Sequence, residues 1–146
     1  MKQSVHMKRI IGNILFSLGL VFVLGGAITQ VRGEDQKLPL ITIHGTGDIT
    51  RGGKPGVFVL NMNPVQIGGM YVSFGVSGTA IPGVDYVNLV SPAHIGQSGY
   101  GVLLVQTLPD RRAPALRQPC KVIVTLEPGP GYAIGDPKSA EMTIEP

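Results

Sequence analysis

Hydrophobic and polar residues alternate along several short stretches of the chain, which is the pattern of half-buried β-strands. The clearest case is 70–77, where every second residue is apolar. The other expected strands span 40–44, 57–62, 84–87, 101–107, 121–127 and 140–144. Residues 101–107 (GVLLVQT) form a continuous apolar run, so we expect this strand to be buried on both faces. About seven short strands, with no helical window after residue 33, predict an all-β antiparallel β-sandwich.

Composition agrees with this prediction. The chain contains 21 glycines and 12 prolines among its 146 residues, and both residue types interrupt helices. Low charge and ample Val, Ile and Leu argue against a disordered chain. About 110 to 120 residues remain after the leader, which is enough for one domain with one core and too few for two.

The first 33 residues have the features of an export signal. Lys2, Lys8 and Arg9 form a positive region, and the apolar stretch 14–24 (ILFSLGLVFVL) follows it. The small residues of 25–27 then provide one cleavage site, and the end of residues 31–33 provides a second. We therefore predict a signal peptide and short tether at 1–33 and a domain at 34–146.

An uncleaved anchor is the alternative interpretation of the leader. Residues 10–27 are marginally long enough to span a bilayer, although Asn13 and four glycines weaken the span. Both interpretations place the positive end inside and the domain outside the cytoplasm. We expect an extracytoplasmic protein that is secreted, periplasmic or on the cell surface, with membrane contact only through this segment if it is uncleaved.

The basic charge belongs to the leader. All nine acidic residues lie after Gly33, so the first 33 residues carry +4 and the remainder carries −1. The folded part therefore offers no evidence of nucleic-acid binding.

The sequence offers little support for catalysis. Cys120 is the only cysteine, so no intrachain disulfide forms, and we expect a covered thiol where the strand 121–127 begins. The motifs G-x-S-x-G and H-E-x-x-H are missing from the sequence. A small hydrolase would need His44 or His94 near Ser91 or Ser98, and their spacing does not favour such a group. We predict a protein that is not an enzyme.

Four segments, in order, resemble the Calx-beta domain family. Residues 76–86 (VSGTAIPGVDY) closely resemble the family signature S-x-G-T-A-x-x-G-x-D-Y. The other matching segments are 53–60 (GKPGVFVL), 121–126 (KVIVTL) and 135–144 (GDPKSAEMTI). The resemblance covers roughly residues 40–145 and implies an immunoglobulin-like β-sandwich, which in better-known members binds Ca²⁺ through acidic loops at one end.

Only part of the family's acidic pattern is present. Asp85 matches the Asp of G-x-D-Y, and Asp110 remains where 108–112 (LPDRR) replaces an I-D-D run. The acid expected near Arg51 is missing, although Asp48 is close, and Glu145 is the only acid after the last strand.

Ca²⁺ takes six to eight oxygen ligands, so Asp85, Asp110 and Glu145 are weak calcium candidates only. Arg111 and Arg112 would also bring positive charge beside the cation. The other interpretation is structural: Asp85 forms a turn with its own backbone, and Asp110 pairs with Arg111 or Arg112.

These observations predict a non-catalytic exported Calx-beta-like module. Its role would be surface adhesion, envelope architecture or protein–protein contact, with the family's calcium site largely degraded. The partner would be another protein or a cell-surface component rather than nucleic acid. The alternative is a calcium-binding Calx-beta domain, in which Ca²⁺ binds at low affinity; otherwise we expect no cofactor.

Overall fold

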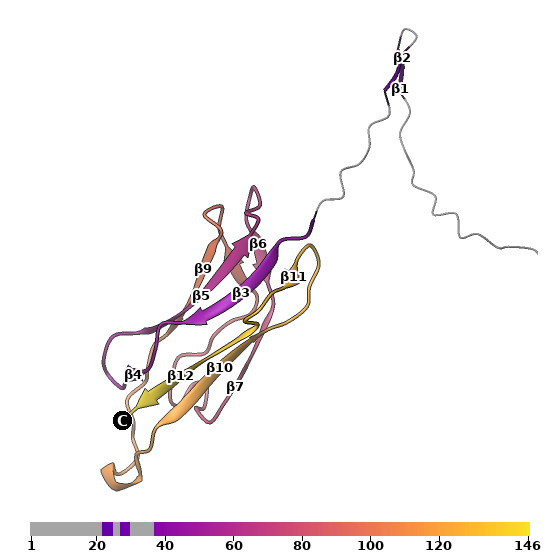
Figure 1. The fold of residues 1–146 in the computed structure, drawn as a ribbon. Coiled ribbons are helices and arrows are strands. Elements are labelled where there is room, and N and C mark those ends of the chain that lie inside the picture. The colour runs from indigo at the N-terminus through magenta and orange to yellow at the C-terminus, as the bar shows by residue number, and fades with distance from the viewer. Residues whose placement is uncertain (1–21, 25–26, 30–36) are drawn as a thin grey trace, which may run out of the picture. The chain divides into compact units, whose positions relative to one another are not determined.

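The computed structural model describes residues 22–24, 27–29 and 37–146, which belong to two separate units (Figure 1). In the first unit, strands β1 (Phe22–Leu24) and β2 (Ala27–Thr29) pair antiparallel. Most of the predicted signal peptide lies outside the described residues. Within the described part of the chain, no helix is long and apolar enough to cross a membrane.

The second unit, residues 37–146, contains two four-stranded sheets that form the layers of a sandwich (Figure 1). One sheet has the order β11–β3–β5–β9, with β11 at Ala133–Ile134, β3 at Leu40–Gly45, β5 at Gly56–Asn63 and β9 at Tyr100–Val105. The other has the order β4–β12–β10–β7, with β4 at Ile49–Thr50, β12 at Ser139–Glu145, β10 at Cys120–Leu126 and β7 at Phe74–Ser77.

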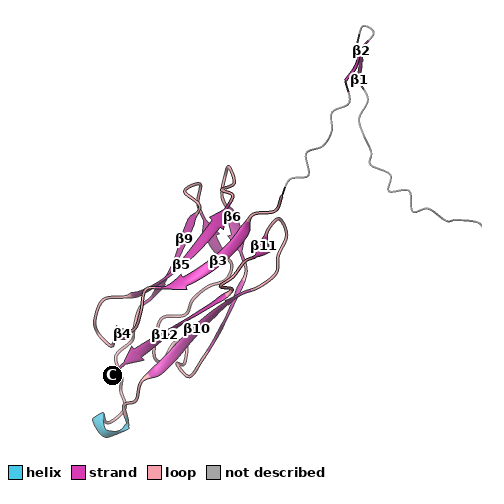
Figure 2. Ribbon diagram, in the orientation of Figure 1, coloured by secondary structure: helices cyan, strands magenta, loops and turns pink. Residues whose placement is uncertain are grey.

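Most strand pairs are antiparallel, and the two parallel pairs are the short edge contacts β11–β3 and β12–β4. Strands β6 (Met70–Val72) and β8 (Ala93–Ile95) form a small antiparallel sheet. A 3₁₀ turn, η1 (Pro114–Leu116), lies in the loop before β10 (Figure 2). The described residues of the second unit thus confirm the predicted all-β sandwich.

Alternation places one side of each long strand in the core. In β10, Val122 and Val124 are fully buried, whereas Lys121 in the same strand is exposed. The same alternation buries Phe58 and Leu60 in β5. Burying this apolar surface is the main favourable term in folding the domain, at roughly 25 cal/mol per Å².

The strand predicted over 70–77 divides at Ser73, because side chains from other parts of the chain, rather than a paired strand, accept the backbone hydrogen bonds there. The hydroxyl of Tyr132 accepts the hydrogen bond from Ser73 N at 3.1 Å, and Ser91 Oγ accepts one from Phe74 N at 3.0 Å. The two halves consequently pair with different strands, β6 with β8 and β7 with β10. The apolar face predicted for this segment is kept, since Val72 and Phe74 are both buried.

Two other predictions for individual strands were wrong. Residues 84–87 form no strand, because the backbone turns between Ile81 and Tyr86: Asp85 N donates to Ile81 O at 2.8 Å and Gly83 N donates to Tyr86 O at 2.8 Å. Strand β9 is not buried on both faces. It lies at the edge of its sheet, and Val102 is 59% exposed.

Candidate functional site

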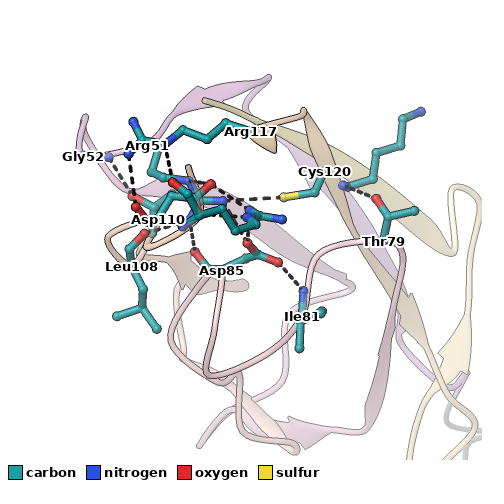
Figure 3. A network of polar contacts seen from close by, with 12 residues as sticks. Arg51, Gly52, Thr79, Ile81, Asp85, Leu108, Asp110, Arg117 and Cys120 are labelled. Carbon is teal, nitrogen blue, oxygen red and sulfur yellow. Dashed lines mark hydrogen bonds and ion pairs between the residues drawn. The ribbon is translucent and has the colours of Figure 1, made fainter. Parts of the chain in front are cut away.

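The candidate site lies at one end of the sandwich, where three loops meet. Arg51 follows β4, Asp85 lies in the turn after residue 81, and Asp110 belongs to the loop after β9 (Figure 3). Backbone hydrogen bonds fix these segments: Arg51 N donates to Glu145 O at the end of β12 at 2.8 Å, and Leu108 N donates to Asp85 O at 2.9 Å. The loops therefore present their side chains to one another from fixed positions.

Asp85 is the buried carboxylate of the site, with only 2% of its side chain exposed. One oxygen, Oδ2, accepts a hydrogen bond from Ile81 N at 2.8 Å and closes the local turn. The other oxygen, Oδ1, accepts from Arg51 Nη2 and from Arg112 Nη2, each at 2.9 Å. Both carboxylate oxygens are thus engaged by donors from the protein itself.

Arg51 places its guanidinium among the oxygen atoms of the three loops, and its side chain is 8% exposed. Besides its bond to the Asp85 carboxylate, it donates from Nη1 to Leu108 O at 2.7 Å and to Asp85 O at 3.3 Å. Its Nε lies 3.8 Å from Asp110 Oδ2 and has no hydrogen-bond partner among the residues that the structure describes. The guanidinium therefore contacts two carboxylates and two main-chain carbonyls (Figure 3).

Asp110 is held by Arg112 from both its backbone and its side chain. Asp110 Oδ1 accepts from Arg112 Nε and Arg112 N, and Oδ2 accepts from Arg112 Nη2. These hydrogen bonds, first those from the side chain and then that from the backbone, lower the pKa of Asp110 from 3.8 to about 2. The same contact raises the pKa of Arg112.

The thiol of Cys120 lies beside this network, 3.9 Å from Arg51 Nη2. Burial raises its pKa, and the nearby carboxylate of Asp85 raises it further. A thiol that is held protonated is a poor nucleophile. Cys120 therefore acts as a small buried side chain at the start of β10, as the sequence predicted for its position.

The three predicted calcium candidates do not converge. Asp85 and Asp110 share the contacts of Arg51 and Arg112, whereas Glu145 is exposed and contacts the site through its backbone carbonyl, which accepts from Arg51 N. Within the described residues, no group of three or more His, Cys, Asp or Glu side chains could hold a metal ion. Asp48, which also lies nearby in sequence, accepts a hydrogen bond from Thr143 N at 2.8 Å instead.

Sequence reasoning missed the role of Arg51. It identified this position only as one that lacks an expected acid, and it placed Arg111 and Arg112 beside the site. The sequence did contain an indication of this role. Arg51 is a basic residue at a position where an acid is expected, so its side chain can supply positive charge to the site. Of the two adjacent arginines, Arg112 makes the ion pairs with Asp85 and Asp110.

Two residues of the hydrolase alternative, Ser91 and His94, have other contacts. Ser91 Oγ accepts a hydrogen bond from a backbone amide, that of Phe74. The ring of His94 packs against Tyr71 with a centroid separation of 5.0 Å.

No protein-family model and no curated protein sequence matches the chain. Solved structures are similar in fold. The apo form of the Calx CBD1 domain aligns with a TM-score of 0.59 at 13% identity, over 75% of this chain and 97% of that domain. CBD12 of CALX1.2 aligns with a TM-score of 0.57, also at 13% identity, over 72% of this chain and 44% of the CBD12 chain.

A third structure, described as the calcium-binding domain CBD12 of CALX1.1, has a TM-score of 0.56 at 13% identity and covers 70% of this chain and 43% of that one. These likenesses agree with the signature at 76–86, in which Asp85 and Tyr86 are buried. The domain of residues 37–146 is a Calx-beta-like β-sandwich.

Proposed function

We propose that this protein is a non-catalytic, exported module for surface adhesion, envelope architecture or protein–protein contact, and that its loop end works without a metal. The observation that carries the proposal is the position of Arg51. Its guanidinium contacts the Asp85 carboxylate and two main-chain carbonyls, with Asp110 at 3.8 Å. The protein thereby provides a cation of its own at the point where the loop oxygens meet.

The donor set does not fit Ca²⁺. A calcium ion takes six to eight oxygen ligands and prefers several carboxylates. Here the oxygens of Asp85 and Asp110 already accept hydrogen bonds from the protein, and two arginines contact them. At about 4 Å, the repulsion between two unit charges is worth roughly 4 kcal/mol at an effective dielectric of 20. The arginine guanidinium groups would therefore repel Ca²⁺ from this position.

A calcium-binding module is the second candidate function, and one specific observation favours it. Two carboxylates and the carbonyl oxygens of Asp85 and Leu108 do surround a common point, which Arg51 occupies. If Arg51 and Arg112 could swing away, these oxygens would be available to a cation. The two functions therefore differ in whether Ca²⁺ displaces the arginines.

Thermal melting of the purified protein in EDTA and in 2 mM CaCl₂ tests the proposal. A dissociation constant near 1 mM would stabilise the protein by about 0.7 kcal/mol, which corresponds to a shift of roughly 2 to 4 °C. We expect a shift no larger than this. A shift above about 10 °C that Asp85→Asn abolishes would instead establish the calcium-binding module.

A charge-reversal variant provides the matched positive case. Arg51→Asp combined with Arg112→Asp replaces both internal cations with carboxylates, so Ca²⁺ should stabilise this variant more than the wild type. Lys54→Asp combined with Lys138→Asp makes the same change in net charge at exposed positions and should leave the calcium response unchanged. An equal calcium response in the two variants would mean that Arg51 does not block a cation site.

Export is tested independently of the loops. Replacing Leu18 and Leu20 with Asp introduces charge into the apolar stretch of the leader. Each Asp raises the free energy of membrane insertion by roughly 2.5 to 3.5 kcal/mol. The wild-type domain should accumulate outside the cytoplasm and the double variant should remain inside. Equal export of both proteins, measured by fractionation and immunoblotting, would contradict an export signal at 1–33.

A further inference from the structure

A pocket of about 490 Å³ opens next to the arginine and aspartate network. Its wall consists of two short segments, 83–84 and 108–112, so the pocket lies between the turn that carries Asp85 and the loop after β9. Val84 is 57% exposed there and gives the wall an apolar part together with Leu108 and Pro109. The volume is within the range of small-ligand sites, roughly 300 to 1,000 Å³.

The charges around the pocket do not cancel. Four arginines, at 51, 111, 112 and 117, stand against the two aspartates, which leaves a formal charge of +2. Arg51 and Arg112 compensate Asp85 and Asp110. Among the described residues, Arg117 donates to two main-chain carbonyls, those of Arg112 and Asp110.

Arg111 lines the pocket, is exposed, and makes no ion pair with an acid in the part of the chain that the structure describes. Its neighbour Arg112 also lines the pocket, and the Arg112 side chain is 41% exposed. Guanidinium groups bind carboxylates through two parallel hydrogen bonds, which a point charge such as a lysine ammonium does not provide. The pocket is therefore complementary to a carboxylate attached to an aliphatic stem.

We propose that this pocket is a docking site for an acidic segment of a partner protein, with Arg111 binding a glutamate or aspartate carboxylate and Val84 and Pro109 packing against its stem. The inference rests on the proposed function as a contact module and names the chemistry of the partner. Nucleic acid is a poorer match, because residues 34–146 carry a net charge of −1 and binding to a phosphate chain depends on positive charge.

Fluorescence polarisation with the purified protein tests the site. The probe is a fluorescein-labelled hexapeptide with two adjacent glutamates flanked by leucines, and its control has glutamine at both positions. We expect the glutamate peptide to bind at least about tenfold more tightly than the glutamine peptide. Arg111→Gln should weaken binding of the glutamate peptide about tenfold, and Arg111→Lys should weaken it less.

Lys138→Gln is the matched control, since it removes one positive charge from an exposed residue. Lys138 precedes the start of β12, and it is the opposite end of this strand, at Glu145, that contacts the site. The affinity of this control variant for the glutamate peptide should stay within about twofold of the wild-type affinity. Equal losses in Arg111→Gln and Lys138→Gln, or no preference for glutamate over glutamine, would overturn the proposal. Tighter binding of a 12-nucleotide single-stranded DNA or of inorganic phosphate than of the peptide would overturn the assignment to a protein partner.

Failure here is distinguishable from failure of the proposed function. If the peptide does not bind while Ca²⁺ leaves the melting temperature unchanged, the acidic-segment site is wrong and the metal-free module stands. If Ca²⁺ stabilises the wild type strongly, the metal-free module is wrong whatever the peptide does. Melting curves of Arg111→Gln verify that the variant remains folded, as expected for an exposed side chain.

Discussion

The guanidinium of Arg51 donates from Nη2 to Asp85 Oδ1 at 2.9 Å, although 34 residues separate the two along the chain. Both side chains are nearly inaccessible, at 8% and 2% exposed. A buried carboxylate is expensive unless it is paired and hydrogen-bonded. The contact thus joins the loop after β4 to the turn before Tyr86 and makes the end of the sandwich depend on an internal ion pair.

Arg51→Met should destabilise the domain strongly, because it leaves the Asp85 carboxylate buried with one guanidinium partner instead of two. Breaking a buried pair costs about 3 to 5 kcal/mol, and we expect about 3 because Arg112 remains. The melting temperature should fall by roughly 12 °C. Lys54→Met at an exposed position should change it by no more than about 2 °C.

A second substitution separates charge from packing at this contact. Adding Asp85→Asn to Arg51→Met removes the carboxylate charge that has lost one of its two guanidinium partners, while the size of the side chain is kept. The double variant should recover part of the stability lost by Arg51→Met alone. Urea unfolding of the wild type, Arg51→Met, Asp85→Asn and the double variant measures the coupling free energy between the two side chains. If the two single effects simply add, the pair does not stabilise the fold.

Phe74→Ala should destabilise the domain by about 3 to 5 kcal/mol, since the phenyl ring of Phe74 is only 4% exposed between the sheets. Ser73→Ala should stay within about 0.5 kcal/mol. The hydrogen bonds of Ser73 to Tyr132 and Glu127 use its backbone, and alanine keeps them. Equal shifts in urea midpoint for these neighbours would show that the apolar face is assigned incorrectly.

Much of the core was predictable because alternation depends only on neighbours in sequence. Val122 and Val124 are buried and Lys121 is exposed, as the period of two requires. The turn that Asp85 closes through Ile81 N was one of the two interpretations of Asp85 drawn from the sequence, but it also replaces the strand predicted over 84–87.

The site was harder to predict from the sequence, because its contacts join distant segments of the chain. Leu108 O accepts from Arg51 across 57 residues, and nothing in the local sequence selects that carbonyl. The break at Ser73 has the same origin, since its backbone N–H pairs with the Tyr132 hydroxyl 59 residues away. Local pattern indicates which residues face the core, but the choice of partner depends on how loops meet after folding.

Gly78→Ala should be far more damaging than Gly47→Ala, although both glycines have left-handed backbone conformations, with φ of +114° and +111°. A methyl group at Gly78 would run into the carbonyl oxygen of Lys121 in β10, whereas the space beside Gly47 is open. Backbone strain alone costs about 1 to 2 kcal/mol, which is our expectation for Gly47→Ala. Gly78→Ala should cost on the order of 3 kcal/mol or more, and comparable melting temperatures would contradict the close approach.

Acid should destabilise the domain through Asp110, whose pKa falls from 3.8 to about 2 in the folded state because Arg112 donates to it from its side chain and backbone. A carboxylate with a lowered folded pKa contributes stability that is fully present above the unfolded pKa and is lost as pH falls through the folded pKa. The loss should therefore occur between about pH 4 and pH 2. Melting temperatures measured at half-unit intervals should fall steeply in this window.

Asp110→Asn should be less stable than the wild type at pH 5 but should lose less stability between pH 4 and pH 2, since the group no longer titrates. Part of the slope should persist, because the hydrogen bond from Thr143 N also lowers the pKa of Asp48. Asp48→Asn combined with Asp110→Asn should flatten the profile further. Asp136→Asn, at an exposed residue without an ion pair among the described residues, provides the control for removing one carboxylate. A full wild-type slope in Asp110→Asn would mean that the contact with Arg112 does not persist in solution.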